Sequence, residues 1–180
     1  MIPVYLQPND QGWVLRVAHE RWKYVVEHNL QAQFPGATER DHQDGAGGEL
    51  AFCRALGLKW PATVNTFTAV PDVSPNWEVR TLRKLPGVKV VDTDPDDRLV
   101  AWVRGKLPRY EIMGYIIAGG AKQHGEWRKD PGKRKRPIWL VPENRMVPID
   151  PGFHALCGYA VDDWGLFSCA FCGRPSHARA

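Results

Sequence analysis

The sequence predicts an α/β protein with one main domain, residues 1–150, and a small C-terminal tail, residues 151–180. Three observations predict this organisation. In the first third of the chain, apolar residues recur every three to four positions, as in amphipathic helices. After Pro61 come short runs of alternating, β-branched and aromatic residues, which favour strands. Beyond Pro142, prolines and glycines become frequent, and three of the four cysteines lie between Cys157 and Cys172.

The composition limits the class of protein. With 180 residues, 43% of them hydrophobic and 11% aromatic, the chain can form a core and is not expected to be disordered. No apolar run is long enough to span a bilayer, and Met1–Asp10 lacks the pattern of a secretory signal. We therefore expect no membrane partner, a cytoplasmic location and reduced cysteines. The net charge of +4 permits a nucleic-acid partner without requiring one.

Two helices are predicted near the N-terminus. Residues 14–30 carry apolar side chains at helical spacing with charged residues between them. Residues 31–46 are polar and contain glycine, so we expect a loop. A second helix is predicted over Gly47–Leu56, and Gly57 is a suitable residue to end it.

The remainder of the main domain reads as strands, with the first of them forming a meander. The predicted strands are Val64–Ala69, Trp77–Leu82, Val88–Val91, Leu99–Arg104, Glu111–Met113 and Ile138–Val141. A glycine-rich stretch after Met113 would open a further helix. The acidic group Asp92, Asp94, Asp96 and Asp97 surrounds Pro95, and we interpret it as a solvated turn rather than a metal site.

Glu49 is the first candidate for chemistry. It shares a helical face with Phe52, Cys53 and Leu56, which is the face expected to pack inward. A carboxylate there is costly unless it is paired or bound to a cation. The alternative is that Glu49 simply lies at a helix N-terminus, where it would interact favourably with the helix dipole.

Asp72 and Glu78 form the second candidate. Asp72 would end one strand and Glu78 would begin the next, so a tight connection would bring the two carboxylates together. Converging carboxylates suit a hard divalent ion such as Mg²⁺. Arg80 lies on the same strand face as Glu78 and would stabilise the charge of a phosphate. The alternative is an ordinary turn followed by a solvated strand face.

The order of these residues resembles the PD-(D/E)XK nuclease superfamily, in particular uncharacterised phage-encoded members. The matching segments are Gly48-Glu49-Leu50-Ala51-Phe52, Pro71-Asp72, Glu78-Val79-Arg80 and Tyr110-Glu111-Ile112-Met113-Gly114-Tyr115, and the resemblance covers residues 45–125. It implies a restriction-endonuclease-like core, in which a mixed sheet is flanked by helices. It also implies hydrolysis of phosphodiester bonds, with DNA as the expected substrate and Mg²⁺ or Mn²⁺ as cofactor.

The resemblance also implies a role for each site residue. Asp72 and Glu78 would bind the metal ion, Glu49 would hold its water or a second ion, and Arg80 would act on the phosphate. Two features depart from the family pattern: Arg80 stands in place of lysine, and only six residues separate Asp72 from Glu78. Because arginine stays charged, Arg80 cannot accept a proton. A nuclease-fold protein that binds nucleic acid or a protein partner without cutting therefore remains the alternative.

A basic stretch is the predicted nucleic-acid contact. It comprises Lys122, Arg128, Lys129, Lys133, Arg134, Lys135 and Arg136, interrupted by prolines and glycine. We expect an exposed loop whose cations contact phosphates. The alternatives are a solvated loop or an arm that contacts another subunit.

The tail predicts a structural zinc site. His154 and Cys157 form one pair with two intervening residues, and Cys169 and Cys172 form another. Such paired ligands, each beside glycine, are typical of closed tetrahedral zinc sites. His177 could replace His154 as a ligand, and three reduced thiols without metal are the alternative. The tail would contact nucleic acid or a protein partner, whereas the solitary Cys53 is expected in the core.

Overall fold

A computed structural model of the protein describes residues 1–33, 36–64, 70–73, 75–83, 86–124, 126–129, 137–149, 159–161 and 167–169. Its elements are, in chain order, β1 (Ile2–Tyr5), α1 (Pro8–Glu27), the 3₁₀ helix η1 (Leu30–Gln33), α2 (Glu39–Leu56), β2 (Trp77–Leu82), β3 (Gly87–Val91), β4 (Leu99–Lys106), β5 (Arg109–Ile117), α3 (Ala118–His124), β6 (Glu126–Lys129), β7 (Pro137–Pro142), the 3₁₀ helix η2 (Glu143–Arg145), β8 (Tyr159–Val161) and β9 (Phe167–Cys169).

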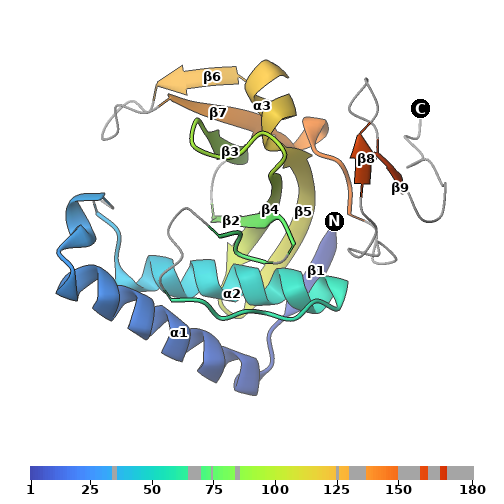
Figure 1. The fold of residues 1–180 in the computed structure, drawn as a ribbon. Helices are drawn as coiled ribbons and strands as arrows, with labels where there is room; N and C mark the ends of the chain where they lie inside the picture. The colour runs from blue at the N-terminus through green and yellow to red at the C-terminus, as the bar shows by residue number, and fades with distance from the viewer. Residues whose placement is uncertain are drawn as a thin grey trace.

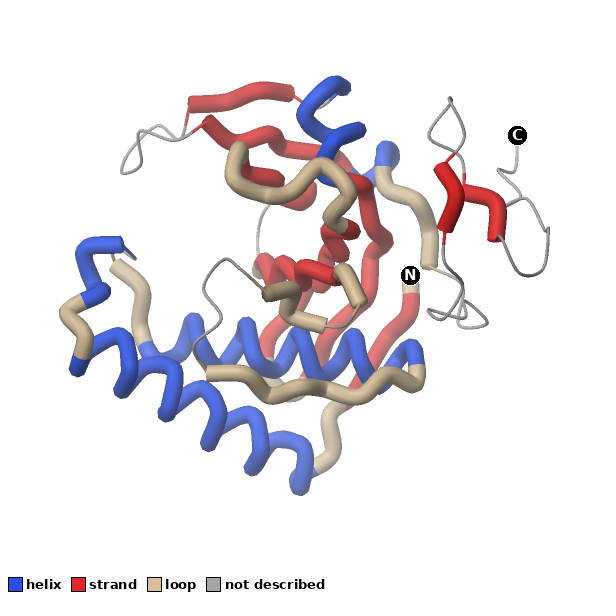
Figure 2. Tube along the Cα trace, in the orientation of Figure 1, coloured by secondary structure: helices blue, strands red, loops and turns tan. Residues whose placement is uncertain are grey.

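The centre of the fold is a four-stranded mixed sheet in the order β1-β5-β4-β2. β2 runs parallel to β4, whereas the other neighbours are antiparallel. Helices α1 and α2 lie on one side of this sheet, and a second sheet, in the order β3-β7-β6, lies with α3 on the other side (Figures 1 and 2). The predicted α/β class, with a mixed sheet flanked by helices, is confirmed.

The predicted meander is wrong, because β3 leaves the first sheet and pairs with β7. Val88 and Val90 of β3 belong to a core shared with Trp102 and Met113, which lies between the two sheets. Burial of these valines against the second face of the central sheet accounts for the departure of β3. β2 pairs instead with β4, in parallel orientation.

β4 is buried on both faces, so two hydrophobic cores share it. Leu99, Ala101 and Val103 pack in the core beneath α2, whereas Val100 and Trp102 pack in the core between the sheets. This alternation follows from the period of two in a strand. β2 follows the same rule: Trp77 and Val79 face α2, which leaves the intervening side chains on the opposite face.

Both helices are longer than the sequence predicts. α1 begins at Pro8, where Asp10 accepts a hydrogen bond from the backbone of Gln7, and α2 begins at Glu39, where Asp41 accepts hydrogen bonds from Thr38. These reciprocal caps favour helix starts in polar sequence. The predicted loop over residues 31–46 is therefore wrong from residue 39 onward. Gly57 ends α2 in the left-handed conformation, as expected.

Two glycines inside α2 bring this helix close to the sheet. A Cβ atom at Gly47 would overlap the side chain of Tyr110 on β5, and one at Gly48 would overlap Thr81 on β2. By contrast, a Cβ at Gly45 would meet nothing within 4 Å. The close approach explains why helix-disfavoured glycines occur here, immediately before Glu49.

The other predicted strands are confirmed at their centres, with Trp77–Leu82 observed at its predicted bounds. The expected exposed loop at 122–136 is wrong in part, since Lys122 lies on α3 and Glu126–Lys129 forms β6. Of the predicted strand Val64–Ala69, residues 65–69 lie outside the described residues.

None of the described helices has both the length and the apolar character needed to cross a membrane.

Candidate active site

Glu49 is a buried carboxylate held by an arginine. It lies in the middle of α2, and its two oxygens accept hydrogen bonds from Nη1 and Nη2 of Arg21 at 2.7 and 2.8 Å. The indole Nε1 of Trp60 donates to the same carboxylate at 3.2 Å, and Arg21 also donates to the carbonyl of Thr63. The interpretation of Glu49 as a residue of a helix N-terminus is therefore wrong. The predicted inward placement is confirmed.

Asp72 lies in the tight turn that leads into β2. Val73 and Trp77 exchange two backbone hydrogen bonds, of 3.1 and 2.9 Å, so the short spacing is accommodated by antiparallel pairing. One oxygen of Asp72 accepts a hydrogen bond from the backbone N–H of Val79 at 2.9 Å. This contact fixes the carboxyl group beside β2.

Asp72, Glu49 and Glu78 are close enough for their charges to interact. Burial raises the pKa of Asp72 to about 7, and the negative charges of Glu49 and Glu78 add to this effect. The hydrogen bond from Val79 and the charge of Arg80 oppose it. Asp72 thus interacts electrostatically with both of the other carboxylates that the sequence singled out, Glu49 and Glu78.

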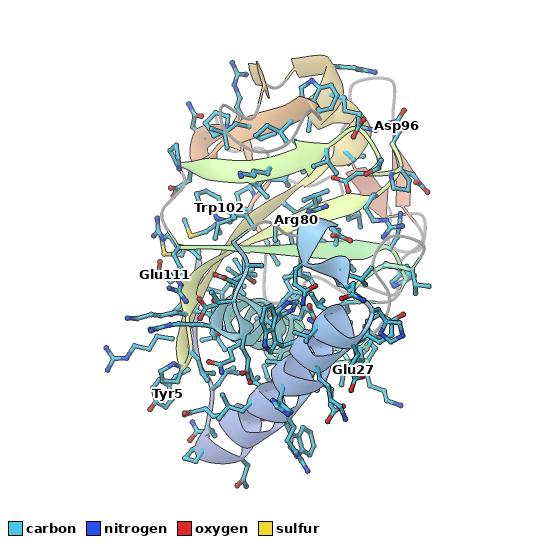
Figure 3. All side chains as sticks on the ribbon, turned by 90° about the vertical axis from the view of Figure 1, so that its left-hand side faces the viewer. Tyr5, Glu27, Arg80, Asp96, Trp102 and Glu111 are labelled. Atoms are coloured by element: carbon cyan, nitrogen blue, oxygen red, sulfur yellow. The ribbon has the colours of Figure 1, made fainter. Side chains whose placement is uncertain are left out.

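Glu78 and Arg80 lie on the face of β2 that points away from α2. Arg80 contacts Glu78 at 3.1 Å and Asp94 at 2.8 Å, and the buried Arg98 lies 3.7 Å from Glu78. In Figure 3, Arg80 lies at the level of the central sheet, between the helices and the second sheet. Burial is the main cause of the raised pKa of Glu78, which the arginines oppose. Both side chains are about one quarter exposed, so this is not an ordinary solvated face.

Asp94 corrects the prediction of a wholly solvated acidic turn. Its side chain is buried and accepts hydrogen bonds from the N–H of Val91 and from Arg80, whereas Asp92, Asp96 and Asp97 are exposed. Lys122 of α3 donates to the carbonyl of Asp94 and to the carboxylate of Asp96. Asp94 therefore connects Arg80 to the turn between β3 and β4.

Sequence reasoning missed four residues of this site, and one of them had a detectable signal. Arg21 occurs at helical spacing between the buried Ala18 and Val25, so it lies on the inward stripe of α1. Nothing comparable marks Trp60, Asp94 or Arg98, because their partners are distant in sequence.

The structure describes only part of the basic stretch that is predicted to contact nucleic acid. Lys122 is paired within the protein, and its side chain is 20% exposed. Arg128 and Lys129 lie on β6, but their side chains, together with Lys133, Arg134, Lys135 and Arg136, lie outside what the structure describes.

The donor set fits a divalent cation in part. Asp72 and Glu78 supply the hard oxygen ligands that Mg²⁺ prefers. Both oxygens of Glu49, however, are hydrogen-bonded to Arg21 and Trp60. Within the described ranges, no three acidic, histidine or cysteine side chains are grouped closely enough to hold a metal ion. Glu49 in this arrangement fits a role in charge balance better than one as a direct ligand.

His42 approaches the same region from the α1-facing side of α2. Its pKa is lowered, first by burial and then by the positive charge of Arg21, and its ring contacts Trp22. In the described part of the chain, its Nε2 has no hydrogen-bond partner. A neutral histidine beside Arg21 adds no charge to the carboxylate group.

The zinc prediction concerns side chains outside the described residues. These are His154, Cys157, Cys169, Cys172 and His177, of which only the backbone of Cys169 is described, at the end of β9. Cys53 is buried in the α2 core as predicted, and burial raises the pKa of its thiol to about 12.

Comparison with protein-family models, curated proteins and solved structures finds no match for this chain. The resemblance to the PD-(D/E)XK superfamily is therefore an expectation from the sequence motifs.

Proposed function

We propose that the protein is a metal-dependent nuclease with a restriction-endonuclease-like core, and that it hydrolyses phosphodiester bonds of DNA at Asp72 and Glu78. The observation that carries the proposal is the position of Asp72, which the N–H of Val79 holds beside β2 and whose pKa burial and the charges of Glu49 and Glu78 raise to about 7. A partly buried carboxylate whose charged form is disfavoured by burial and by like-charged neighbours gains from binding a divalent cation.

The residues of the chain divide the work as follows. Asp72, held by the N–H of Val79, and Glu78 would bind Mg²⁺ or Mn²⁺. When bound, the cation would polarise the phosphate and lower the pKa of a water molecule. Arg80 and Arg98 already oppose the negative charge of Glu78 and would stabilise charge on the phosphate. Arg21 holds the carboxylate of Glu49 in place through two hydrogen bonds.

A cleavage assay tests this proposal. Labelled single- and double-stranded DNA would be incubated in Mg²⁺ or Mn²⁺ with the wild type, Asp72→Asn and Glu78→Gln. Glu111→Gln is the matched control, because Glu111 is also a strand glutamate paired with an arginine, Arg104, but lies on β5 away from the turn. We expect both site variants to lose at least about a hundredfold in rate and the control to retain it. Cleavage that survives in Glu78→Gln would overturn the assignment.

A second candidate is a nuclease fold that binds nucleic acid without cutting. It is favoured by the arginine partners, because Arg21 contacts both oxygens of Glu49 and Arg80 contacts both Glu78 and Asp94. This candidate predicts binding that is unaffected by Mg²⁺ and no cleavage by any variant.

We also propose a structural Zn²⁺ in the tail, held by Cys157, Cys169, Cys172 and either His154 or His177. β8 and β9 are antiparallel, with Tyr159 opposite Cys169. The chain therefore enters β8, two residues after Cys157, at the same end of the ribbon at which it leaves β9 for Cys172. This topology supports a shared ion, which would supply stability that so small a tail lacks.

A further inference from the structure

A pocket beside the candidate active site has an unusual lining. It lies between α1, the C-terminal half of α2 and the segment that follows, with a volume of about 460 Å³. Two tryptophans, Trp13 and Trp60, and three cations, Arg16, Arg54 and Lys59, contribute to its wall, and the remaining lining residues are apolar. Since none of the described residues that line it is acidic, the pocket suits a ligand that combines an aromatic surface with negative charge.

Trp13 gives the pocket an exposed aromatic surface. Its side chain is 52% exposed, although an indole is among the largest apolar surfaces that a protein can bury. An exposed indole beside cations is the arrangement by which proteins stack nucleobases and hold the adjoining phosphates. Stacking of this kind requires an unpaired base, because both faces of a base within a duplex are covered.

The cations in the pocket wall are the second observation that points to a nucleotide ligand. Arg54 contacts Asp10 at 2.6 Å, so part of its charge is balanced within the protein. Arg16 and Lys59 are exposed, and no described residue forms an ion pair with either of them. These two side chains are therefore free to contact phosphate.

Trp60 connects the pocket to the candidate active site. Its ring lines the pocket, while its Nε1 donates to Glu49 at 3.2 Å. We propose that the pocket binds an unpaired nucleotide of single-stranded nucleic acid, with its base on Trp13 and its phosphates at Arg16 and Lys59. The inference rests on the proposed function in taking nucleic acid as the substrate, and it specifies the single-stranded form.

Binding can be measured without cleavage. The probe is a fluorescein-labelled oligo(dT) of ten nucleotides, followed by fluorescence anisotropy in EDTA. We expect Trp13→Ala to weaken binding about tenfold or more, because stacking on the indole is lost, and Trp13→Tyr to restore most of the affinity. Tyr5→Ala is the matched control, since Tyr5 is 54% exposed on β1 and does not line the pocket. Its affinity should stay within about twofold of the wild type, as expected for a surface residue outside the site.

Two further measurements identify the bound form. Arg16→Ala and Lys59→Ala should each reduce the slope of log K against log salt by about 0.7, the value for one phosphate contact on a single strand. A duplex of the same length should bind at least about tenfold more weakly, because its bases cannot stack on Trp13. Circular dichroism would confirm that each variant is folded.

The inference is overturned if the wild type fails to bind oligo(dT), if Trp13→Ala binds as tightly as Tyr5→Ala, or if the duplex binds equally well. It is also overturned if sedimentation shows that Trp13→Ala dissociates a dimer while oligo(dT) binding is unchanged. Measuring oligo(dT) binding and DNA cleavage on the same variants separates the two proposals. Intact oligo(dT) binding without cleavage by the wild type would reject the nuclease and leave the pocket standing, whereas cleavage that is indifferent to Trp13 would reject the pocket alone.

Discussion

The close contact between α2 and the central sheet predicts different effects on stability for two glycine substitutions about one helical turn apart. At Gly48, an added Cβ would overlap Oγ1 of Thr81 and come within 3.0 Å of its Cβ and Cγ2. At Gly45, in the same helix, an added Cβ would meet nothing within 4 Å. Gly48→Ala therefore tests the packing, and Gly45→Ala is its matched control.

The magnitude follows from two terms. Replacing glycine by alanine inside a helix stabilises it by about 1 kcal/mol, and this gain is common to both variants. Forcing a methyl group into a packed interface costs about 1–3 kcal/mol, and only Gly48→Ala incurs this cost. The difference in unfolding free energy between the two variants is thus the packing term, about 1–3 kcal/mol.

Urea denaturation or calorimetry would measure this difference. For a chain of this length each kcal/mol corresponds to about 2–4 °C in melting temperature, so Gly45→Ala should melt above Gly48→Ala by roughly 2–12 °C. Equal stabilities would refute the close approach of α2 to β2.

Three further predictions concern the charged groups and the tail. Arg21→Met should lower the unfolding free energy by about 3–5 kcal/mol, because it leaves the buried Glu49 unpaired, and recovery in the double variant with Glu49→Leu would identify the pair as the cause. Asp72 holds its proton up to about pH 7 when folded but only to about its ordinary pKa of 3.8 when unfolded, so stability should fall as pH rises between these values, and less steeply in Asp72→Asn; equal slopes would contradict the raised pKa. Metal analysis should find about one Zn²⁺ per chain, with three thiols becoming reactive after chelation while Cys53 stays protected; zinc-free protein with freely reactive tail thiols would remove the site.

Local patterns predicted most elements because their signals are contained in a few residues. The alternation in Trp77–Leu82 predicts the strand and places Glu78 and Arg80 on one of its faces, and Gly57 marks the end of α2. The sequence predicts a loop over residues 31–46 because this stretch is polar and contains glycine, whereas α2 already begins at Glu39. Gly47 and Gly48 lie inside the predicted helix, but no sequence pattern gives them a role. Their role depends on Thr81 and Tyr110, which contact α2 only in the folded sheet. Tertiary packing overrode local preference at this point.

In the candidate active site too, some residues are predictable from the sequence and others are not. Glu49, Asp72 and Glu78 were recognisable because carboxylates at buried or turn positions require partners. The partners themselves were not, because Arg21 precedes Glu49 by 28 residues and Asp94 follows Arg80 by 14. Pairing across such distances is set by strand order, and the parallel pairing of β2 with β4 was not predicted.

The central claim is that Asp72 and Glu78 bind a divalent cation together, and calorimetric titration with Mn²⁺ tests it most directly. At pH 8, where Asp72 is mostly ionised, the wild type should bind one Mn²⁺ at this site. Asp72→Asn should weaken this binding by at least about tenfold, as expected for the loss of a ligand carboxylate, while Glu111→Gln should leave it unchanged. Identical Mn²⁺ binding by the wild type and Asp72→Asn, or no binding by the wild type, would contradict the account.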